Sequence, residues 1–313
     1  MDLLISSLEV ISVVFIIGII VYLLTPRRYQ SSESVATSYD EWTDDGILEF
    51  YWGEHIHLGH YGSPPSRKDF LQAKADFVHE MVRWGGLSDL PAGTRILDVG
   101  CGIGGSSRIL AKEYGFDVTG VTISPQQVKR ATELTPDGVT AKFKVDDAMA
   151  LSFDDGSFDV VWCIEAGPHM PDKAVFAKEL IRVVKPGGKL VVADWNQRDD
   201  RKNPLNFWEK PVMKQLLEQW SHPKFASIEE FAELLEETGL VNEDKVTTAD
   251  WSKETLPSWF DSIWQGVAKP KGLIMFGVSG FIKSLREVPT LLLMRLAFGS
   301  GLCRFGMFKA TRN

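Results

Sequence analysis

The feature that most constrains this chain is a glycine-rich loop, Gly100-Cys101-Gly102-Ile103-Gly104-Gly105. It follows a short apolar run at 94–99, typical of a buried parallel strand, and precedes a helical pattern at 106–114. Glycine has no Cβ, so the backbone can approach a ligand closely, and the amino end of the next helix offers free N–H groups. The loop therefore predicts a ligand site at a strand-to-helix turn.

Dinucleotide-binding dehydrogenases use nearly the same glycine spacing, so the loop alone does not identify the ligand. A dinucleotide site expects an acidic residue about 20 positions later, at the end of the second strand, to bind the ribose. Here the strand predicted at 117–121 runs into the neutral segment Thr122-Ile123-Ser124-Pro125-Gln126-Gln127. This weakens the dehydrogenase interpretation.

Strand and helix patterns alternate along the rest of the chain. Pro186 and the two glycines after it are expected to end a helix at 173–184 and turn the chain back into the sheet. Further strands are predicted at 141–145, 158–163, 189–194, about 245–251 and 304–311. This order predicts an α/β fold with a parallel, doubly wound sheet that binds its ligand at the carboxyl ends of the strands.

Four motifs in order, ILDVGCGIGG, the pair Asp147-Ala148, DGSFDVVW and RVVKPGGKLVVADW, resemble those of class I S-adenosylmethionine-dependent methyltransferases. The segments GVTISPQQ and IEAGPHMPDK are similar to the branch with tocopherol, sterol and cyclopropane-fatty-acid methyltransferases. The resemblance implies a Rossmann-like fold with a seven-stranded, mostly parallel sheet, a helical lid insertion and the cofactor S-adenosyl-L-methionine. It also implies a prenyl-lipid hydroquinone of the vitamin E pathway as the substrate.

The resemblance assigns the cofactor site residue by residue. It places the loop residues Gly100, Cys101, Gly102 and Gly104 against the methionine part, with Asp98 near the ammonium group. The branch replaces the usual ribose acid with neutral groups, here Thr122, Ser124 and Gln127. Asp147 and Ala148 match the positions that hold the adenine, and Glu165 is expected to face the reacting methyl group.

Methylation of a hydroquinone ring favours a general base, because loss of a phenolic proton places negative charge on the ortho carbon. The candidates are His169, Glu165 and His57, with His169 first. A general base should have a pKa near the working pH, or a pKa that burial raises to that range. The alternative is that His169 only hydrogen-bonds and positions the substrate, which by itself can lower a barrier by several kcal/mol.

The first residues predict membrane attachment. Residues 3–24 are almost wholly apolar and long enough to cross a hydrocarbon core of about 30 Å. Asp2 and Glu9 precede Arg27 and Arg28, so the positive-inside rule predicts a single-pass protein with a cytoplasmic catalytic domain. A cleaved signal peptide is disfavoured by the acidic start. Because no transit peptide pattern precedes the span, a bacterial plasma or photosynthetic membrane is expected.

The predicted organisation is a transmembrane anchor at 1–25, a linker and aromatic cap at 26–65, and a methyltransferase domain at 66–313. Within the linker, the polar segment 30–37 suggests a flexible tether. A lid insertion is expected at about 252–300, with apolar runs at 273–281 and 291–298 that are too short to span a membrane. The lid is expected to be a buried helical cover, whose outer face could also touch a bilayer surface.

Composition narrows the possible partners. A net charge of −8 argues against nucleic acid, which requires clustered basic residues. Three widely spaced cysteines, with no C-x-x-C pair, predict no structural metal, and His55, His57 and His60 lack a carboxylate at ligand spacing.

Three rival functions remain open. The first, a γ-tocopherol or sterol methyltransferase, would share the cofactor motifs. The second, a non-catalytic membrane scaffold, would be expected to have lost the glycines or Asp147, and none is lost. The third, a dehydrogenase, predicts nicotinamide binding.

Overall fold

The computed structural model describes residues 28–269 and 271–313. Its centre is a seven-stranded sheet in the order β3-β2-β1-β4-β5-β7-β6, with β7 antiparallel to both of its neighbours. The strands are β1 (Arg95–Val99), β2 (Asp117–Thr122), β3 (Ala141–Val145), β4 (Phe158–Ile164), β5 (Val184–Gln197), β6 (Thr247–Asp250) and β7 (Cys303–Thr311). The predicted α/β fold with a mostly parallel sheet is therefore confirmed.

Successive side chains of a strand point to opposite faces of the sheet, and helices cover both faces. Ile96 and Val160 belong to the core beneath α4 (Phe70–Trp84) and α5 (Gly105–Tyr114). Their neighbours Leu97 and Val161 belong to the core beneath α7 (Lys173–Arg182) and α9 (Ile228–Glu237). The helix α6 (Pro125–Glu133) packs beside β2 and β3. This accounts for the continuous apolar runs of the central strands.

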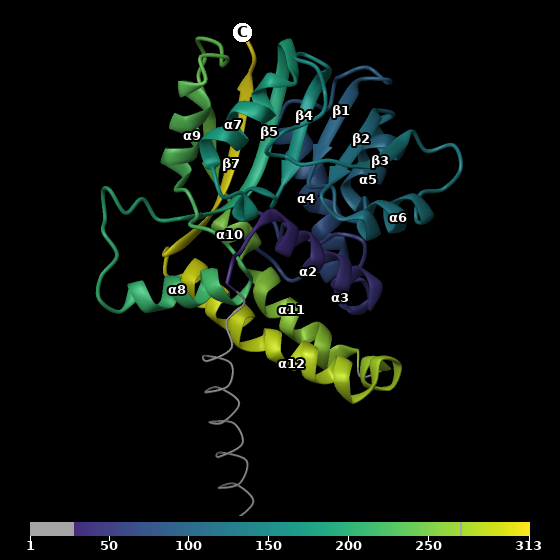
Figure 1. The fold of residues 1–313 in the computed structure, drawn as a ribbon, viewed down its shortest axis with the longest axis vertical. Coiled ribbons are helices and arrows are strands. Elements are labelled where there is room, and N and C mark those ends of the chain that lie inside the picture. The colour runs from purple at the N-terminus through teal and green to yellow at the C-terminus, as the bar shows by residue number, and fades with distance from the viewer. Residues whose placement is uncertain (1–27, 270) are drawn as a thin grey trace, which may run out of the picture.

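A third layer of helices lies across one end of the sheet. It contains α2 (Ser32–Asp44), α3 (Ile47–Trp52), α8 (Glu209–Gln219), α10 (Ser252–Thr255), α11 (Pro257–Ala268) and α12 (Lys271–Gly299). Figure 1 shows this layer below the sheet and the C-terminus at the opposite end. Since β7 leads to that terminus and runs antiparallel to β5, the parallel strands end toward the helical layer. The segment predicted as a lid insertion supplies α10, α11 and α12.

The segment predicted as a flexible tether is partly helical. The hydroxyl of Ser31 accepts a hydrogen bond from the backbone N–H of Ser34, and the hydroxyl of Ser34 accepts one from the backbone N–H of Ser31. This reciprocal pair is a capping box, which satisfies two backbone donors at the start of α2. The Ser-rich composition that suggested a tether is instead a helix start signal, and the tether prediction was wrong from residue 32 onward.

The sequence also misplaced the start of β5. The helix α7 ends at Arg182, and Val184 already pairs with Phe158 in the sheet. The register then shifts between Phe158 and Val160, so that Val160 pairs with Lys189. Pro186 and its two glycines therefore form a bulged part of the strand. They do not form a turn before it.

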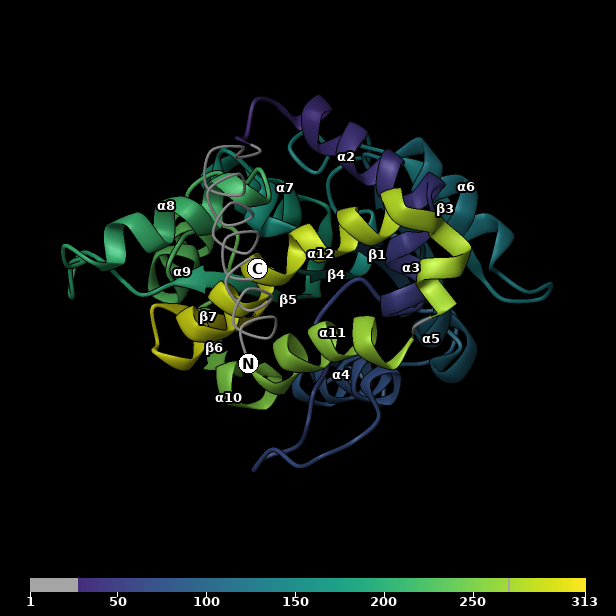
Figure 2. The same ribbon diagram turned by 90° about the horizontal axis from the view of Figure 1, so that it is seen from below.

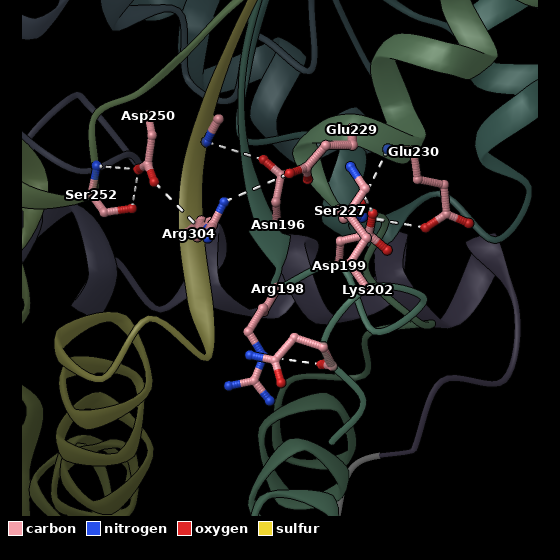
Figure 3. Close-up of polar contacts among 12 residues, drawn as sticks. Asn196, Arg198, Asp199, Lys202, Ser227, Glu229, Glu230, Asp250, Ser252 and Arg304 are labelled. Atoms are coloured by element: carbon pink, nitrogen blue, oxygen red, sulfur yellow. Dashed lines mark hydrogen bonds and ion pairs between the residues drawn. The ribbon is translucent and has the colours of Figure 1, made fainter. Parts of the chain in front are cut away.

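Polar side chains join the far end of β5 to its neighbours (Figure 3). The Asn196 side-chain oxygen accepts a hydrogen bond from the backbone N–H of Gly306 in β7 at 3.0 Å. Arg304 lies between Asp250 of β6 and Glu229 of α9, at 3.9 Å from each carboxylate. These contacts fix the antiparallel edge of the sheet against α9.

The predicted single-pass membrane location is corrected by the structure. Across residues 28–269 and 271–313, no helix is both long enough and apolar enough to cross a bilayer. The predicted span at 3–24 lies outside the described residues. The two apolar runs of the insertion both fall within α12, which Lys283, Arg286 and Arg295 interrupt and whose backbone is non-helical at Gly277.

The two sides of α12 give a test of the fold. Met294 is fully buried in the core, whereas Leu296, two residues later, is 65% exposed. We expect Met294→Ala to lower the free energy of unfolding by about 2–4 kcal/mol through the cavity it leaves. Leu296→Ala should change it by about 0.5 kcal/mol or less, since surface changes of this kind are nearly neutral. Urea unfolding measures both, and equal losses would contradict this orientation of α12.

Candidate active site

The glycine loop turns at the end of β1 through left-handed backbone conformations. Gly100 has φ +76°, and its N–H and that of Cys101 both donate to the Val121 carbonyl, at 2.8 and 3.0 Å. A Cβ on Gly100 would collide with the Cβ of Ala166, which follows β4. Only glycine allows the ends of β1 and β4 to come this close.

At Gly102, unlike Gly100, the backbone is not tightly packed against a neighbouring strand end. Its φ is +54°, and a Cβ added there would meet only the Cδ1 atom of Ile56, at 3.8 Å. The same residue borders two adjoining cavities. A side chain at Gly102 would therefore project toward open space that a ligand can use, so the requirement for glycine here comes from the ligand site and the backbone angle. It does not come from core packing.

The larger cavity has about 780 Å³ of empty space, part of which is open to solvent. It brings together eight residues predicted for the site: Gly100, Gly102, Thr122, Gln127, Asp147, Ala148, Glu165 and His169. Its wall also includes Val35 and Tyr39 from α2, which the sequence analysis placed only in the linker and cap. The density of aromatic residues at 39–42 was the available signal for this wall.

The smaller cavity, of about 310 Å³, lies under the glycine loop and shares Gly100 and Gly102 with the larger one. It is bordered by three more of the predicted residues, Asp98, Cys101 and His57. The two cavities adjoin, so a ligand can extend from Asp98 past the loop to Asp147.

Two predicted residues, Gly104 and Ser124, border neither cavity. Ser124 is fully buried and caps α6, where its hydroxyl accepts a hydrogen bond from the Gln127 N–H at 3.0 Å. It also donates to the carboxylate of Asp40 in α2. Gly104 turns the chain into α5, where a Cβ would clash with Phe143 and Arg108. Both residues fix the backbone next to the cavities without bordering them.

Glu165 occupies a strained position directly after β4. It is a non-glycine residue with φ +56°, a conformation that is costly and often found at functional sites. Its carboxylate accepts a hydrogen bond from the Leu58 N–H at 2.8 Å. Burial raises the pKa of Glu165 to about 8, against the opposing effect of this hydrogen bond. Its pKa therefore lies near the working range of a general base.

His169 ends a short 3-10 turn, Gly167–His169, beside Glu165 in the cavity wall. Its Nε2 atom lies 2.8 Å from the hydroxyl of Tyr39. Burial lowers the pKa of His169 to about 3, and the positive charge of Lys173 contributes to the same shift. The imidazole is therefore neutral at physiological pH and forms a hydrogen-bonded couple with Tyr39.

His57 is separated from the other two candidate bases. It borders the smaller cavity, where its Nδ1 atom lies 2.7 Å from the Leu58 carbonyl and its Nε2 atom 3.3 Å from the Ser106 hydroxyl. Burial lowers the pKa of His57 to about 3. Glu165 and His169 share the larger cavity, so the structure groups those two and leaves His57 beneath the glycine loop.

Two acidic residues, Asp98 and Glu54, border the smaller cavity, and Glu54 is paired with Arg108. Asp98 is buried and accepts a hydrogen bond from the Ser107 hydroxyl at 2.5 Å. Burial raises the pKa of Asp98 to about 6, which shows that the carboxylate is incompletely compensated by its surroundings. A cationic group bound here would favour its ionised form.

The sheet order, its antiparallel last strand and a glycine turn opening on a cavity define a class I methyltransferase fold. The chain matches the methyltransferase domain family over residues 97–192. A cyclopropane synthase from Mycobacterium tuberculosis has a similar fold, with a TM-score of 0.74 at 17% identity over 90% of this chain and 99% of that one. For a geranyl diphosphate C-methyltransferase from Streptomyces coelicolor the TM-score is 0.66 at 19% identity, over 90% and 98% of the two chains.

Closer relatives narrow the assignment. The 2-methyl-6-phytyl-1,4-hydroquinone methyltransferase of Synechocystis sp. is 78% identical over 93% of this chain and 91% of that protein. The chloroplastic tocopherol O-methyltransferase of Arabidopsis thaliana is 34% identical over 88% of this chain and 80% of that protein. The chain belongs to the S-adenosylmethionine-dependent methyltransferase family that contains these enzymes. The predicted enzyme class and cofactor are therefore confirmed.

A paired substitution tests the glycine turn. Gly102→Ala should weaken binding of S-adenosylhomocysteine at least about tenfold, because the new methyl group enters the cavity. Gly138→Ala is the control, since Gly138 also has positive φ, but a Cβ added there would meet nothing within 4 Å and would lie away from the site. Both should cost about 1–2 kcal/mol of stability from backbone strain. Calorimetric titration measures the affinity, and an unchanged affinity for Gly102→Ala would contradict the assignment.

Proposed function

We propose that this enzyme methylates a ring carbon of a prenylated hydroquinone in tocopherol biosynthesis. The reaction converts 2-methyl-6-phytyl-1,4-hydroquinone to 2,3-dimethyl-6-phytyl-1,4-hydroquinone. The observation that carries the proposal is the 78% identity to the Synechocystis enzyme of that name over nearly the whole of both chains. The tocopherol O-methyltransferase alternative is supported at only 34% identity.

The residues of the two cavities fit S-adenosylmethionine. Asp98 would receive its ammonium group, and the backbone at Gly100 and Gly102 would lie against the methionine part. Thr122 and Gln127, whose side chains are hydrogen-bonded to each other at 2.7 Å, would face the ribose. Asp147 and Ala148 would hold the adenine. When bound, the cofactor supplies a methyl group on a positively charged sulfur, which a ring carbon accepts after the neighbouring phenol has lost its proton.

The cavity favours Glu165 as the base that removes this proton. A pKa of about 8 suits the Glu165 carboxylate for proton abstraction near neutral pH, whereas a pKa of about 3 makes the imidazole of His169 a weak base. This reverses the order expected from the sequence. Positive charge in the cavity would favour the ionised carboxylate further. The proton would move from the phenolic oxygen to a carboxylate oxygen of Glu165. After methyl transfer, the methylated ring carbon would lose its own hydrogen as a proton, which restores the aromatic ring and the phenol.

The couple of His169 and Tyr39 is assigned to orientation. The Nδ1 atom of His169 is buried and has no hydrogen-bond partner within the described chain. A buried polar atom without a partner is costly, so this atom is suited to receive a hydroxyl of the acceptor ring. Holding the ring in place by this bond would leave the other side of the imidazole fixed by the Tyr39 hydroxyl.

A phytyl tail partitions strongly into lipid, at about 0.8 kcal/mol for each buried CH₂ group. The proposed acceptor therefore resides in a membrane or another lipid phase. The enzyme must take it from that phase.

Product analysis tests the acceptor directly. The purified enzyme is incubated with labelled S-adenosylmethionine and, separately, with 2-methyl-6-phytyl-1,4-hydroquinone, γ-tocopherol and a sterol. We expect the label in the product of 2-methyl-6-phytyl-1,4-hydroquinone, at the ring carbon beside the existing methyl group. Mass spectrometry and NMR locate the labelled position. Methylation of γ-tocopherol or the sterol in preference to the hydroquinone would overturn the proposal.

A substitution tests the base. Glu165→Gln keeps the size of the side chain and removes the ionisable group, so turnover should fall by about 100-fold or more. In the unaltered enzyme, kcat/KM should rise with pH as the carboxylate loses its proton, at about 8 or below once the cofactor's positive charge is bound, and the variant should lack this rise. Glu133→Gln, at an exposed position on α6, is the control. A Glu165→Gln enzyme with normal turnover would remove Glu165 from the mechanism, and His169→Ala would then be the next variant to test.

A further inference from the structure

The outer surface of α11 and α12 is unusually apolar. Of the large hydrophobic side chains that are exposed in the described residues, most lie on these two helices. We call this surface the α11–α12 face, and it consists of Phe260, Trp264, Ile274, Met275, Ile282, Leu285, Leu292 and Leu296, each between 46% and 87% exposed. Exposed large hydrophobic side chains concentrated on two neighbouring helices indicate an interaction surface.

The second half of α12 is apolar on two opposite sides. Leu291, Met294 and Phe298 face the core, as expected for a helix that covers a domain. Leu285, Leu292 and Leu296 are exposed, and their spacing places them on one stripe of the helix. Packing against the domain explains only the inner side. The outer stripe requires a second apolar environment.

The charges around this face are predominantly basic. Between residues 257 and 299 there are five basic residues and two acidic ones, in a chain whose net charge is −8. The basic residues are Lys269, Lys271, Lys283, Arg286 and Arg295. Two of them also contact the protein, because Lys269 donates to the carbonyls of Phe50 and Tyr51 and Lys283 pairs with Asp45 at 3.1 Å. Both acidic groups are engaged inward, because Asp261 accepts a hydrogen bond from the Tyr61 hydroxyl at 2.6 Å and Glu287 accepts one from the indole of Trp220 at 2.7 Å.

The position of the face in the fold supports the same partner. Figure 2, seen from below, shows α8, α11 and α12 together across one side of the molecule. Phe207 and Trp208, just before α8, are more than 75% exposed. Arg28, where the described chain begins, forms an ion pair with Glu218 of α8 at 3.3 Å. The described chain therefore begins beside this helical layer.

The helical layer also lies next to the active site. The parallel strands end toward it, and Tyr39 and Val35 of α2, in the same layer, line the larger cavity. The α11–α12 face and the cavity that Glu165 borders therefore share this helical layer.

We propose that the α11–α12 face docks on the surface of a bilayer that contains anionic lipids, with both helices lying in the plane of the interface. Apolar side chains enter the acyl boundary, and basic side chains meet the headgroups. A second copy of the chain fits less well, because a two-fold contact through this face would place two basic surfaces against each other. Docking stands by itself, whereas delivery of the acceptor from the bilayer rests on the proposed function.

Site-directed labelling tests the docking. The three cysteines of the chain are buried, so an environment-sensitive fluorophore can be placed at Leu285→Cys or Leu292→Cys in the full chain. The control is Glu237→Cys, an exposed position near the opposite end, where Asn313 donates to the Leu240 carbonyl at 2.9 Å. The probe is a vesicle of phosphatidylcholine mixed with phosphatidylglycerol.

We expect the labels at 285 and 292 to shift to shorter wavelength with these vesicles and to be quenched by brominated lipid, and the label at 237 to do neither. Vesicle binding without a response at 285 and 292 would mean that another part of the chain holds the membrane, and would overturn the proposal. A response that needs no vesicles and grows with protein concentration would show self-association, and would also overturn it. Equal responses on pure phosphatidylcholine would refute the role of the basic residues.

A kinetic variant separates docking from catalysis. Leu285→Glu combined with Leu292→Glu should lower turnover of vesicle-embedded acceptor by about tenfold, through a raised KM. Turnover of detergent-dispersed acceptor should be unchanged. Equal loss with both forms of acceptor would contradict delivery through this face. No turnover of any hydroquinone by the unaltered chain would instead refute the proposed function and leave the labelling result standing.

Discussion

The close approach of two strand ends is the constraint on which the site depends. Gly100 follows β1 and Ala166 follows β4, and there is no room between them for a Cβ on the first. Glu165 precedes Ala166 directly and has a left-handed backbone conformation, with φ +56°. The loop that fits the cofactor and the carboxylate that fits the acceptor are thus parts of one packed unit. A substitution at either strand end would therefore disturb both the glycine loop and Glu165.

The rest of the site comes from the chain before the sheet. Lys74 of α4 is fully buried and donates to the carbonyls of Trp52 and His55, at 2.8 and 2.6 Å. It holds the segment whose Leu58 N–H bonds to Glu165. Burial lowers the pKa of this lysine well below its usual range. Its hydrogen bonds to the two carbonyls offset the free-energy cost of burying its amino group. The amino-terminal segment therefore positions Glu165 and also forms part of the cavity wall.

The sequence predicted the sheet well because buried parallel strands give continuous apolar runs between turn residues. The family resemblance pointed to Gly102, Asp147 and Glu165, and the structure groups them in one cavity because the carboxyl ends of parallel strands meet at one edge of the sheet. The sequence could not place Tyr39 against His169, since that contact depends on how α2 docks. The pKa values of the three candidate bases were also beyond its reach, because they depend on burial. The sequence allowed that the outer face of the lid could touch a bilayer, but it could not show which residues of α12 are exposed, since that also depends on packing.

The central claim is that the two cavities form one cofactor site whose reacting end faces Glu165 and His169. A crystal structure of the chain with S-adenosylhomocysteine tests it most directly. The account predicts the adenine against Asp147 and Ala148, the homocysteine ammonium group at Asp98 and the sulfur turned toward Glu165. A ligand in the reverse orientation, or a sulfur atom directed away from Glu165, would contradict it.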